Sequence, residues 1–384
     1  MGGMPAAKLA AEFGTPLVVY CEQTVRARAR AYRRAAPDAL IVYGTKAFPN
    51  VAVMRLLAEE GLGADVSTLG ELRFAQAAGV SPDRLVVHGN NKSDEELQAA
   101  AEAGAAFVVL DSVEELGRAR AAGVQRMLAR VTPGIEAETH EAIRTGHLGS
   151  KFGMSPEEAL GIRRTVAGIH VHIGSQLLST SGPEQTLAWL NEFLAEAGWL
   201  PEVVDLGGGL GVPTSPDETA PSIPEFVELL VSGLNVDARL ILEPGRSLVG
   251  QAGVTLYAVG SVKRAGERSW VAIDGGLSDN PRPQLYGAAY TAVLANRMEE
   301  DAHGAFGVAG KHCESGDVLI GAVDLPQPRR GDLLAVPATG AYTLAMGSNY
   351  NVVPRPAAVL ASDGEARLIR GRETEDDLLA LELR

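Results

Sequence analysis

The stretch LIVYGTKAFPNVAVMRLLAEEGLGADVS, residues 40–67, decides the fold of this chain. Its two ends are short runs of apolar and β-branched residues, which are typical of buried strands. Between them lies a segment with apolar residues at helical spacing, opened by Asn50 as an N-cap and closed by Gly61. The stretch therefore predicts one strand–helix–strand unit, and such units build parallel sheets.

The same alternation continues along the chain to about residue 243. Apolar, β-branched runs recur in LIVYG, LGADVS, LVVHG, FVVLD, MLARV, GIHVHIG, VVDLG and RLILE. Segments with helical spacing separate them at intervals of roughly 20–25 residues, with longer gaps after the fifth and sixth runs. Eight such units predict a closed (β/α)8 barrel.

The alternation stops after residue 247, and stretches such as SWVAIDGG, DVLIGAV and DLLAVPA indicate strands joined by short turns. The segment TPLVVYCEQ, residues 15–23, precedes the barrel units and could be a further strand of that second sheet. We therefore expect an α/β protein with a barrel over residues 22–247. A mainly β domain over residues 248–384 would follow it, joined by the N-terminal segment 1–21.

Composition limits the class of function. The chain has 384 residues, 46% of them hydrophobic, which suits two domains with sizeable cores. A net charge of −14 without a cluster of lysine or arginine argues against nucleic acid as a partner. No apolar run approaches the roughly 20 residues that cross a membrane, and the N-terminus lacks the pattern of a signal peptide. The two cysteines make no disulfide framework, so we expect a cytoplasmic protein.

Polar or glycine residues stand at the carboxyl end of every predicted barrel strand. Active sites of such barrels lie at this end, so these residues are the candidates for chemistry. In strand order they are Lys46, Asp65 with Ser67, His88, Asp111, Arg130, His172, Gly207–Gly209, and Glu243. Packing alone would not require polar residues at the same end of all eight strands.

Lys46 is one of only six lysines in a chain with 28 arginines. A lysine at a barrel mouth can be a cation for a substrate anion, a proton shuttle or a Schiff-base nucleophile. The structural alternative is a surface lysine that keeps its ammonium in water.

Two further segments favour a cofactor. Backbone N–H groups of the loop DLGGGLG, residues 205–211, could hold a phosphate, although a tight turn would explain the glycines equally well. The loop is not a dinucleotide fingerprint, because Val212 stands where the last glycine would be. Glu243 could place a carboxylate against a ring nitrogen, with Gly245 allowing close approach of the backbone. A Schiff-base lysine, a phosphate loop and such a carboxylate are together what pyridoxal phosphate needs.

From about residue 14 to residue 357 the sequence resembles the fold-type III, pyridoxal-phosphate-dependent decarboxylases. Ten motifs carry the resemblance in the order of that family: YGTKAFPN, ADVSTLGEL, HGNNKSDEEL, RVTPGIEAETHEAIRTGHLGSKFG, HVHIGSQL, DLGGGLG, EPGRSLV, DGGLSDNPRPQLYGA, GKHCESGDVL and GAYTLAMGSNYN. Any one motif is modest evidence, but ten in order are highly specific. The resemblance implies an alanine-racemase-like architecture, a barrel followed by a β domain.

The resemblance assigns roles around the cofactor. Lys46 would hold pyridoxal phosphate covalently, His172 would stack on its ring, and Glu243 would keep the ring nitrogen protonated. The HVH alternation places His170 and His172 on the same side of a strand, while a histidine buried in the core is the structural alternative. The phosphate would be met by a set of small residues and one arginine: Ser175, Gly208, Gly209, Gly245 and Arg246. Arg246 could instead meet a substrate carboxylate.

The resemblance also places functional residues in the second domain. Cys313 would return a proton to the substrate, and the usual pKa of a thiol, about 8.5, suits that work. A small buried residue is the alternative for this cysteine, but its neighbours His312 and Glu314 are polar. Substrate contacts would come from Arg282, Tyr286, Glu314 and Tyr342, with Tyr342 also near the cofactor; taken alone, Arg282 in NPRPQLY would be a surface loop residue. In the family, Cys313 and Glu314 come from a partner subunit, so a homodimer with shared sites is implied.

Within the family, the sequence most resembles the members that convert meso-2,6-diaminopimelate to L-lysine and CO2. The segment LSTSGPEQTL, residues 178–187, shapes the substrate pocket in the family and carries no recognisable contact for the far end of that substrate. Decarboxylation of another basic amino acid, of carboxynorspermidine or of a carrier-bound substrate is therefore the alternative. A racemase on the same barrel is another option, but the CESGD and SNYN segments point towards decarboxylation instead. A non-catalytic cofactor-binding homologue is a different class, and the presence of Lys46 and CESGD argues against it. No metal site is predicted.

Overall fold

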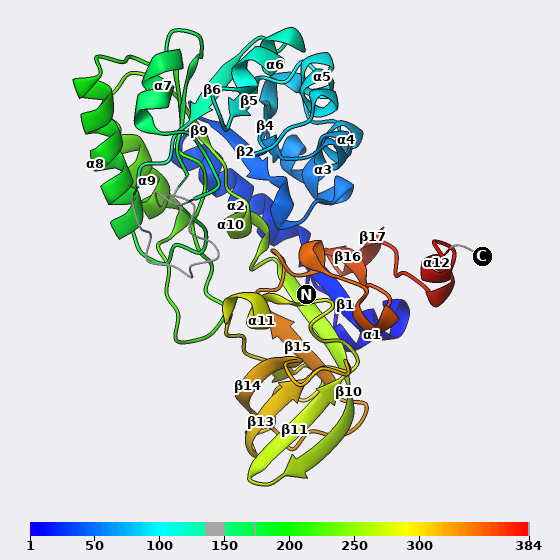
Figure 1. The fold of residues 1–384 in the computed structure, drawn as a ribbon. Coiled ribbons are helices and arrows are strands. Elements are labelled where there is room, and N and C mark those ends of the chain that lie inside the picture. The colour runs from blue at the N-terminus through cyan, green and yellow to red at the C-terminus, as the bar shows by residue number, and fades with distance from the viewer. Residues whose placement is uncertain (135–149, 173, 383–384) are drawn as a thin grey trace. The chain divides into compact units, whose positions relative to one another are not determined.

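The computed structural model describes residues 1–134, 150–172 and 174–382. Eight parallel strands close into a barrel (Figure 1), which confirms the predicted fold class. The strands are β2 (Leu40–Gly44), β3 (Gly63–Val66), β4 (Leu85–Val87), β5 (Phe107–Leu110), β6 (Met127–Arg130), β7 (Gly168–His170), β8 (Val203–Asp205) and β9 (Arg239–Leu242). The motif over residues 130–153 falls partly outside the described residues.

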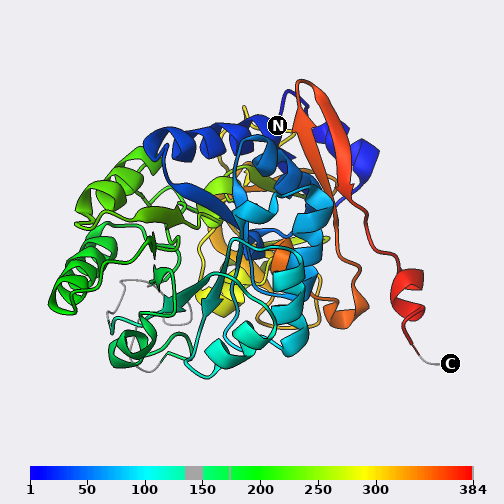
Figure 2. The same cartoon turned by 90° about the horizontal axis from the view of Figure 1, so that it is seen from above.

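Helices follow the barrel strands and lie outside them, as the view from above shows (Figure 2). Several begin with a capping box, for example at Ser93, Ser155 and Ser222, where a serine hydroxyl accepts from the third helical N–H. The helices of this part are α2 (Glu22–Ala35), α3 (Val51–Glu59), α4 (Leu69–Ala78), α5 (Asp94–Glu102), α6 (Glu115–Ala121), α7 (Pro156–Ile162), α8 (Ser181–Glu196), α9 (Ile223–Gly233) and α10 (Arg246–Val249).

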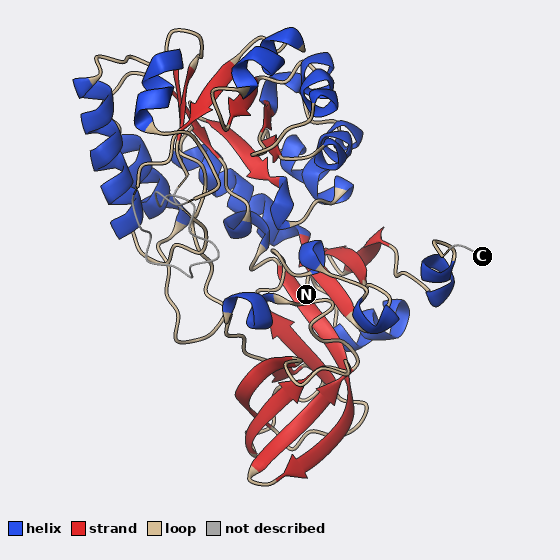
Figure 3. Ribbon diagram, in the orientation of Figure 1, coloured by secondary structure: helices blue, strands red, loops and turns tan. Residues whose placement is uncertain are grey.

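A mixed β-sheet forms the rest of the structure (Figure 3), and β1 is its N-terminal strand. β1 pairs with β10 antiparallel and with β16 parallel, so the N-terminal segment lies inside this sheet. The strands are β1 (Leu17–Cys21), β10 (Gly253–Ala265), β11 (Arg268–Ile273), β12 (Val293–Leu294), β13 (Gly304–Ala309), β14 (Val318–Leu325), β15 (Leu333–Pro337), β16 (Ala357–Ser362) and β17 (Glu365–Arg370). The helices are α1 (Ala6–Phe13), α11 (Arg282–Tyr286) and α12 (Glu375–Leu379).

The chain divides into two compact units. The sheet unit contains residues 1–25, 213–218 and 249–384, and the barrel unit contains residues 26–212 and 219–248. No helix in the described part of the chain is long and apolar enough to span a membrane.

The interior of the barrel has an apolar layer that fixes the strands. Val42, Val86, Val109, Leu128, Val203 and Ile241 belong to one buried cluster, and they occupy equivalent places on six of the eight strands. Successive side chains of a strand alternate between the two faces, so residues two positions further along also point inward. The next inward layer therefore lies at the carboxyl end of the barrel.

Candidate functional site

The layer above the apolar one is polar. Two residues after the apolar positions come His88, Asp111, Arg130, Asp205 and Glu243. The strand register pairs Arg130 with His170 and His170 with Asp205, which places these three side chains at one level of the barrel. All these residues are at least nine-tenths buried. Burial of so many ionisable groups is costly unless they pair with one another.

Lys46 lies at this end of the barrel, in a single helical turn over Thr45–Ala47 that follows β2. Its side chain is 50% exposed, and its Nζ donates to Oδ2 of Asp65 at 2.8 Å. Asp65 is buried, and the register sets it beside Gly44 on the neighbouring strand. Because Asp65 holds an ammonium that remains accessible, Lys46 is placed to react with a bound molecule.

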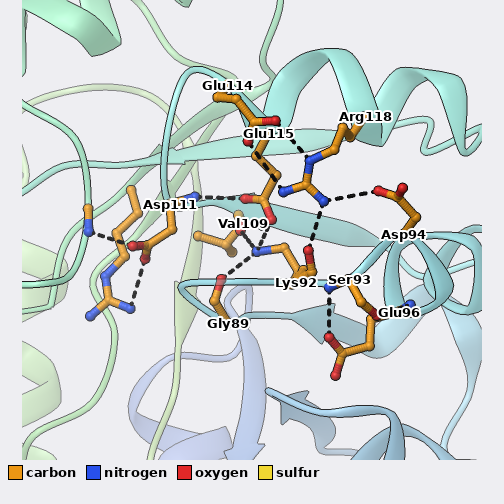
Figure 4. A network of polar contacts seen from close by, with 12 residues as sticks. Gly89, Lys92, Ser93, Asp94, Glu96, Val109, Asp111, Glu114, Glu115 and Arg118 are labelled. Atoms are coloured by element: carbon orange, nitrogen blue, oxygen red, sulfur yellow. Dashed lines mark hydrogen bonds and ion pairs between the residues drawn. The ribbon is translucent and has the colours of Figure 1, made fainter.

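Lys92 provides a contrast, because it also lies near the strand ends but its ammonium is enclosed by acceptors (Figure 4). Its Nζ donates to the carbonyl oxygens of Gly89 at 2.6 Å and Val109 at 2.7 Å, and it pairs with Glu115 at 3.1 Å. The side chain is only 1% exposed. Two of its donors bind carbonyl oxygens and its charge is paired with a carboxylate, so Lys92 holds loops together and Lys46 is the candidate nucleophile.

Glu243 follows β9 and lies between two histidines. Its Oε1 is 2.5 Å from Nε2 of His88, and its Oε2 is 3.4 Å from Nε2 of His170. Burial raises the pKa of Glu243, but the two histidines lower it more, so its pKa lies well below the usual value. The same burial lowers the pKa of His170 to about 4, against an opposing effect of Glu243. Glu243 is therefore an ionised carboxylate.

Asp205 adds a further carboxyl group at the end of β8. Burial, and next the charge of Glu243, raise the pKa of Asp205 well above its usual value, so we assign it the protonated form. Its Oδ1 accepts from the N–H of Gly207 at 2.9 Å. Donor atoms of His88, His170, Asp205 and Glu243 lie within 4.8 Å of one another, a spacing that a metal ion would also fit. The direct contacts between histidines and carboxylate account for the same spacing without an ion.

His172 lies in the loop after β7, two residues beyond the strand, which ends at His170. The prediction that the strand extends to His172 is wrong, because its partner β8 stops at Asp205 and turns through Gly207, whose φ is +64°. The His172 ring is half-buried and lies 6.5 Å from the His170 ring, with the planes 19° apart. Its Nδ1 accepts from the N–H of Gly208 at 3.3 Å, which fixes the ring.

The glycine loop after β8 packs so closely that side chains would not fit. A Cβ on Gly208 would lie 2.2 Å from the carbonyl oxygen of Glu243, and a Cβ on Gly209 would lie 2.9 Å from that of Gly174. Gly209 also has a φ of +112°, which favours glycine. The loop is therefore pressed against the segments that carry His172 and Glu243.

Arg246 and Ser175 complete this side of the barrel mouth. Nη2 of Arg246 donates to Oγ of Ser175 at 3.1 Å, and Arg246 is 6% exposed. Gly245 precedes Arg246 in a turn in which Pro244 accepts from the N–H of Gly44 at 3.1 Å. Eight of the predicted residues thus gather in the barrel unit: Lys46, His172, Ser175, Gly208, Gly209, Glu243, Gly245 and Arg246.

The other predicted residues lie in the sheet unit. Cys313 and Glu314 are exposed in the loop between β13 and β14, and the N–H of Cys313 donates to Oδ1 of Asn351 at 3.0 Å. Asp317 holds this loop, since it accepts from the N–H of His312 at 2.9 Å and from its Nδ1 at 2.8 Å. The thiol is thus presented on a fixed loop.

Arg282 is 3% exposed, so the reading of NPRPQLY as a surface loop is wrong. The residue begins α11, and its Nη1 donates to the Tyr290 hydroxyl at 2.6 Å. The same helix carries Tyr286, whose hydroxyl contacts Sδ of Met346 at 3.8 Å, and Gln284 contacts the carbonyl oxygen of Gly316 at 3.0 Å. Tyr342 lies in the segment before Met346 with a φ of +56°.

Sequence reasoning did not assign roles to Asp65, His88, Arg130, His170 and Asp205, which surround Glu243 and Lys46 in the structure. Their signal is the polar residue two positions after a buried apolar residue on each strand. The pattern identifies which side chains point into the barrel, but not which of them touch.

Comparison with known proteins identifies the class that this fold and site define. The family model described as "Pyridoxal-dependent decarboxylase, pyridoxal binding domain" matches residues 22–250. The residues present fit that cofactor: an accessible lysine, an ionised buried carboxylate, a loop without side chains and a buried arginine. Pyridoxal phosphate is therefore the cofactor of this chain.

Curated relatives narrow the class to one family. The chain is 45% identical to a diaminopimelate decarboxylase of Actinosynnema pretiosum, covering 100% of this chain and 92% of that protein. It is 41% identical to one of Bacillus subtilis, covering 100% and 94%. The solved structure of the Helicobacter pylori enzyme, complexed with L-lysine, has a TM-score of 0.91 at 30% identity over 98% of each chain. The chain belongs to the diaminopimelate decarboxylase family.

Proposed function

We propose that this protein removes CO2 from meso-2,6-diaminopimelate and releases L-lysine, the last product of lysine biosynthesis. The match over 100% of this chain and 92–94% of two diaminopimelate decarboxylases carries the proposal. The structural support is Lys46, which is half-exposed beside Asp65 at the barrel end where Glu243 and the glycine loop also lie. Related solved structures from Helicobacter pylori and M. jannaschii contain L-lysine, which would be the product here.

The proposed roles in the barrel unit follow from charge and position. Pyridoxal phosphate supplies, when bound, an electron sink for the electron pair left by departing CO2. Lys46 would hold the cofactor covalently until the substrate amine takes its place. Glu243, as an ionised carboxylate, would accept a hydrogen bond from the ring nitrogen and stabilise its positive charge. His172 would hold the ring in place.

The phosphate would be held by the N–H groups of Gly208, Gly209 and Gly245 together with Ser175 and Arg246. Close packing of Gly208 and Gly209 leaves backbone donors without side chains over them. Arg246 already donates to Ser175, so both side chains would be available to the same phosphate. The alternative for Arg246 is a substrate carboxylate.

The remaining roles are proposed for residues of the sheet unit. Cys313 gives its proton to the α-carbon of the substrate after CO2 has left, which replaces the broken C–C bond by a C–H bond. Arg282, with Tyr286 and Tyr342, binds the carboxylate at the other end of diaminopimelate, and Glu314 binds its ammonium. Nε of Arg282 has no hydrogen-bond partner among the described residues, which leaves a donor for such a ligand.

We further propose that the active enzyme is a homodimer in the cytoplasm, with Cys313 and Glu314 contributed to the site of the partner subunit. The functional domains would be the barrel of residues 22–247 and the β domain of residues 248–384 with segment 1–21. Exposure of Cys313 and Glu314 supports their availability to a second chain.

The test of the activity is release of CO2 and lysine from meso-diaminopimelate by purified protein with added pyridoxal phosphate. Ornithine, lysine and arginine are run in parallel. Lysine formed from diaminopimelate alone supports both chemistry and substrate. CO2 from another amino acid instead would keep the chemistry and replace the substrate. No product from any of the four would contradict the proposal.

Variants test the roles. Lys46→Ala should abolish the visible absorbance of bound cofactor, and a normal spectrum would refute the assignment of Lys46. Cys313→Ala should bind the cofactor normally but turn over slowly, whereas full activity would place the proton donor elsewhere. Mixing inactive Lys46→Ala and Cys313→Ala chains should restore activity through shared sites. No recovery despite proven subunit exchange would refute the shared site.

A further inference from the structure

Two buried side chains outside the assigned roles connect the lysine of the cofactor site to its carboxylate. Asp65 lies at the end of β3, and His88 follows β4. In the closed barrel, β9, β2, β3 and β4 are consecutive neighbours. Glu243, Lys46, Asp65 and His88 therefore come from four adjacent strands, one from each.

Two of the three contacts along this path are hydrogen bonds, and the third is a longer approach of two ionisable groups. Lys46 donates to Oδ2 of Asp65 at 2.8 Å. The other oxygen of Asp65, Oδ1, has no hydrogen-bond partner among the described residues, and Nε2 of His88 lies 3.8 Å from it. The same Nε2 is 2.5 Å from Oε1 of Glu243. Because a carboxylate only accepts, Nε2 must carry the proton and donate it toward Glu243.

Burial makes this donor important. The side chains of Asp65, His88 and Glu243 are 1%, 6% and 5% exposed, so water does not replace a lost partner. His170 contacts only the second oxygen of Glu243, at 3.4 Å, and its ring meets the His88 ring edge-on at 4.9 Å. Oε1 of Glu243 thus depends on His88, and removal of a partner from a buried carboxylate is costly.

We propose that His88 is a positioning residue that holds Glu243 against the cofactor ring, and that the buried Asp65 beside it links it to Lys46. The proposal rests on the proposed roles of Lys46 and Glu243. In this proposal, Asp65 and His88 together support Lys46, which would bind the cofactor covalently, and Glu243, which would contact its ring nitrogen. His88 acts through Glu243 and need not touch the substrate.

The first experiment compares two replacements of His88 in the full-length protein. His88→Gln keeps an N–H donor near the place of Nε2, whereas His88→Met keeps the volume and removes the donor. The readouts are the dissociation constant of pyridoxal phosphate from the stripped protein and the absorbance spectrum of the bound cofactor between pH 6 and 9. A role in filling space alone would leave the two variants alike.

We expect His88→Met to bind the cofactor at least ~10-fold more weakly, the loss of a charged hydrogen bond, and to change the pH dependence of the spectrum. His88→Gln should stay within about threefold of the unchanged protein in affinity. Equal affinity and equal spectra for His88→Met and the unchanged protein would overturn the proposal. If His88→Met does not fold, His88→Asn replaces it, because its shorter amide cannot reach the place of Nε2. Equal cofactor affinity and equal spectra for His88→Asn and His88→Gln would then overturn the proposal.

Two controls separate this proposal from the function on which it rests. Lys46→Ala and Glu243→Gln are titrated with cofactor in the same way. A normal cofactor spectrum in Lys46→Ala refutes the proposed function, whatever the His88 variants show. If Lys46→Ala loses that spectrum while His88→Met keeps normal cofactor affinity and a normal spectrum, only the positioning role of His88 is refuted. Metal analysis of the purified protein is the last control, since a stoichiometric ion on His88 and Glu243 would replace the proposed hydrogen bond and overturn it.

Discussion

Replacement of Lys92 by methionine should destabilise the barrel unit by about 3–5 kcal/mol, the usual cost of removing one partner of a buried ion pair. The ammonium of Lys92 has three acceptors, the carbonyl oxygens of Gly89 and Val109 and the carboxylate of Glu115, at 2.6, 2.7 and 3.1 Å. Methionine has nearly the same length but offers no donor. The side chains of Lys92 and Glu115 are 1% and 3% exposed, so the remaining groups gain no water in exchange.

The cost arises mainly from the carboxylate that is left behind. In Lys92→Met, the described contact that remains to Glu115 is the N–H of Asp111, at 3.0 Å from its Oε2. A double variant, Lys92→Met with Glu115→Gln, removes the unpaired charge and keeps an oxygen for that N–H. We therefore expect the double variant to recover about half of the loss, which is a favourable coupling between the two sites.

The assay is urea unfolding of the full-length protein, followed by circular dichroism, for both single variants and the double variant. Lys263→Met is the matched control: this lysine is exposed on β10, and its replacement should change the free energy of unfolding by less than about 0.5 kcal/mol. A loss below 1 kcal/mol in Lys92→Met, or a double variant less stable than Lys92→Met, would refute the reasoning.

Three further predictions concern pH and packing. Burial raises the pKa of Asp279 to about 7, although the hydrogen bond from the Tyr257 hydroxyl lowers it, so the folded state favours the protonated carboxyl. The free energy of unfolding should therefore fall by up to about 4 kcal/mol as the pH rises from 4 to 7. Asp279→Asn should reduce that pH dependence in urea unfolding, and an unchanged dependence would contradict the prediction. Burial raises the pKa of Glu373, but hydrogen bonds from Arg355 and Asn349 bring it down to about 2. Glu373→Gln should therefore lower the free energy of unfolding by about 1–2 kcal/mol at pH 7, and this difference should vanish as the pH falls toward 2. A loss of stability that does not depend on pH would count against the ion pair. Gly208→Ala should weaken cofactor binding at least ~10-fold because its Cβ would meet backbone at 2.2 Å. Gly161→Ala, at an exposed position of α7, should bind the cofactor normally and be about 0.5–1 kcal/mol more stable. Equal cofactor titrations for both variants would refute the role of close packing.

The fold of this chain could be predicted because its signals are local. The run LIVYG and the helical spacing from Val51 onward are each decided within about ten residues, and eight repeats leave a closed barrel as the simplest parallel arrangement. The predicted length of the strand before His172 failed for a different reason. The strand ends where its neighbour turns at Gly207, and that neighbour is distant in sequence.

The site could be predicted as a set of strand ends but not as a set of contacts. His88 and Glu243 are separated by 155 positions in the sequence, and nothing near either residue indicates the other. Arg282 shows the same limit, because its prolines indicate a loop whereas its burial depends on Tyr290 and the sheet beneath it. Motif resemblance predicted roles for single residues, and the structure shows the neighbours that contact them.

The apolar layer and the polar layer inside the barrel have different roles. The apolar layer of Val42, Val86 and Ile241 stabilises the closed sheet, while the layer above it buries acids that would lower stability on their own. Asp205 avoids the cost of burying a charge because it stays protonated. Glu243 is ionised, and its contacts with His88 and His170 offset that cost. Valine or leucine would pack this layer better than buried acids do. Its retention is explained if the carboxylates are needed to hold a charged cofactor, so the least favourable part of the barrel interior is the part that defines its chemistry.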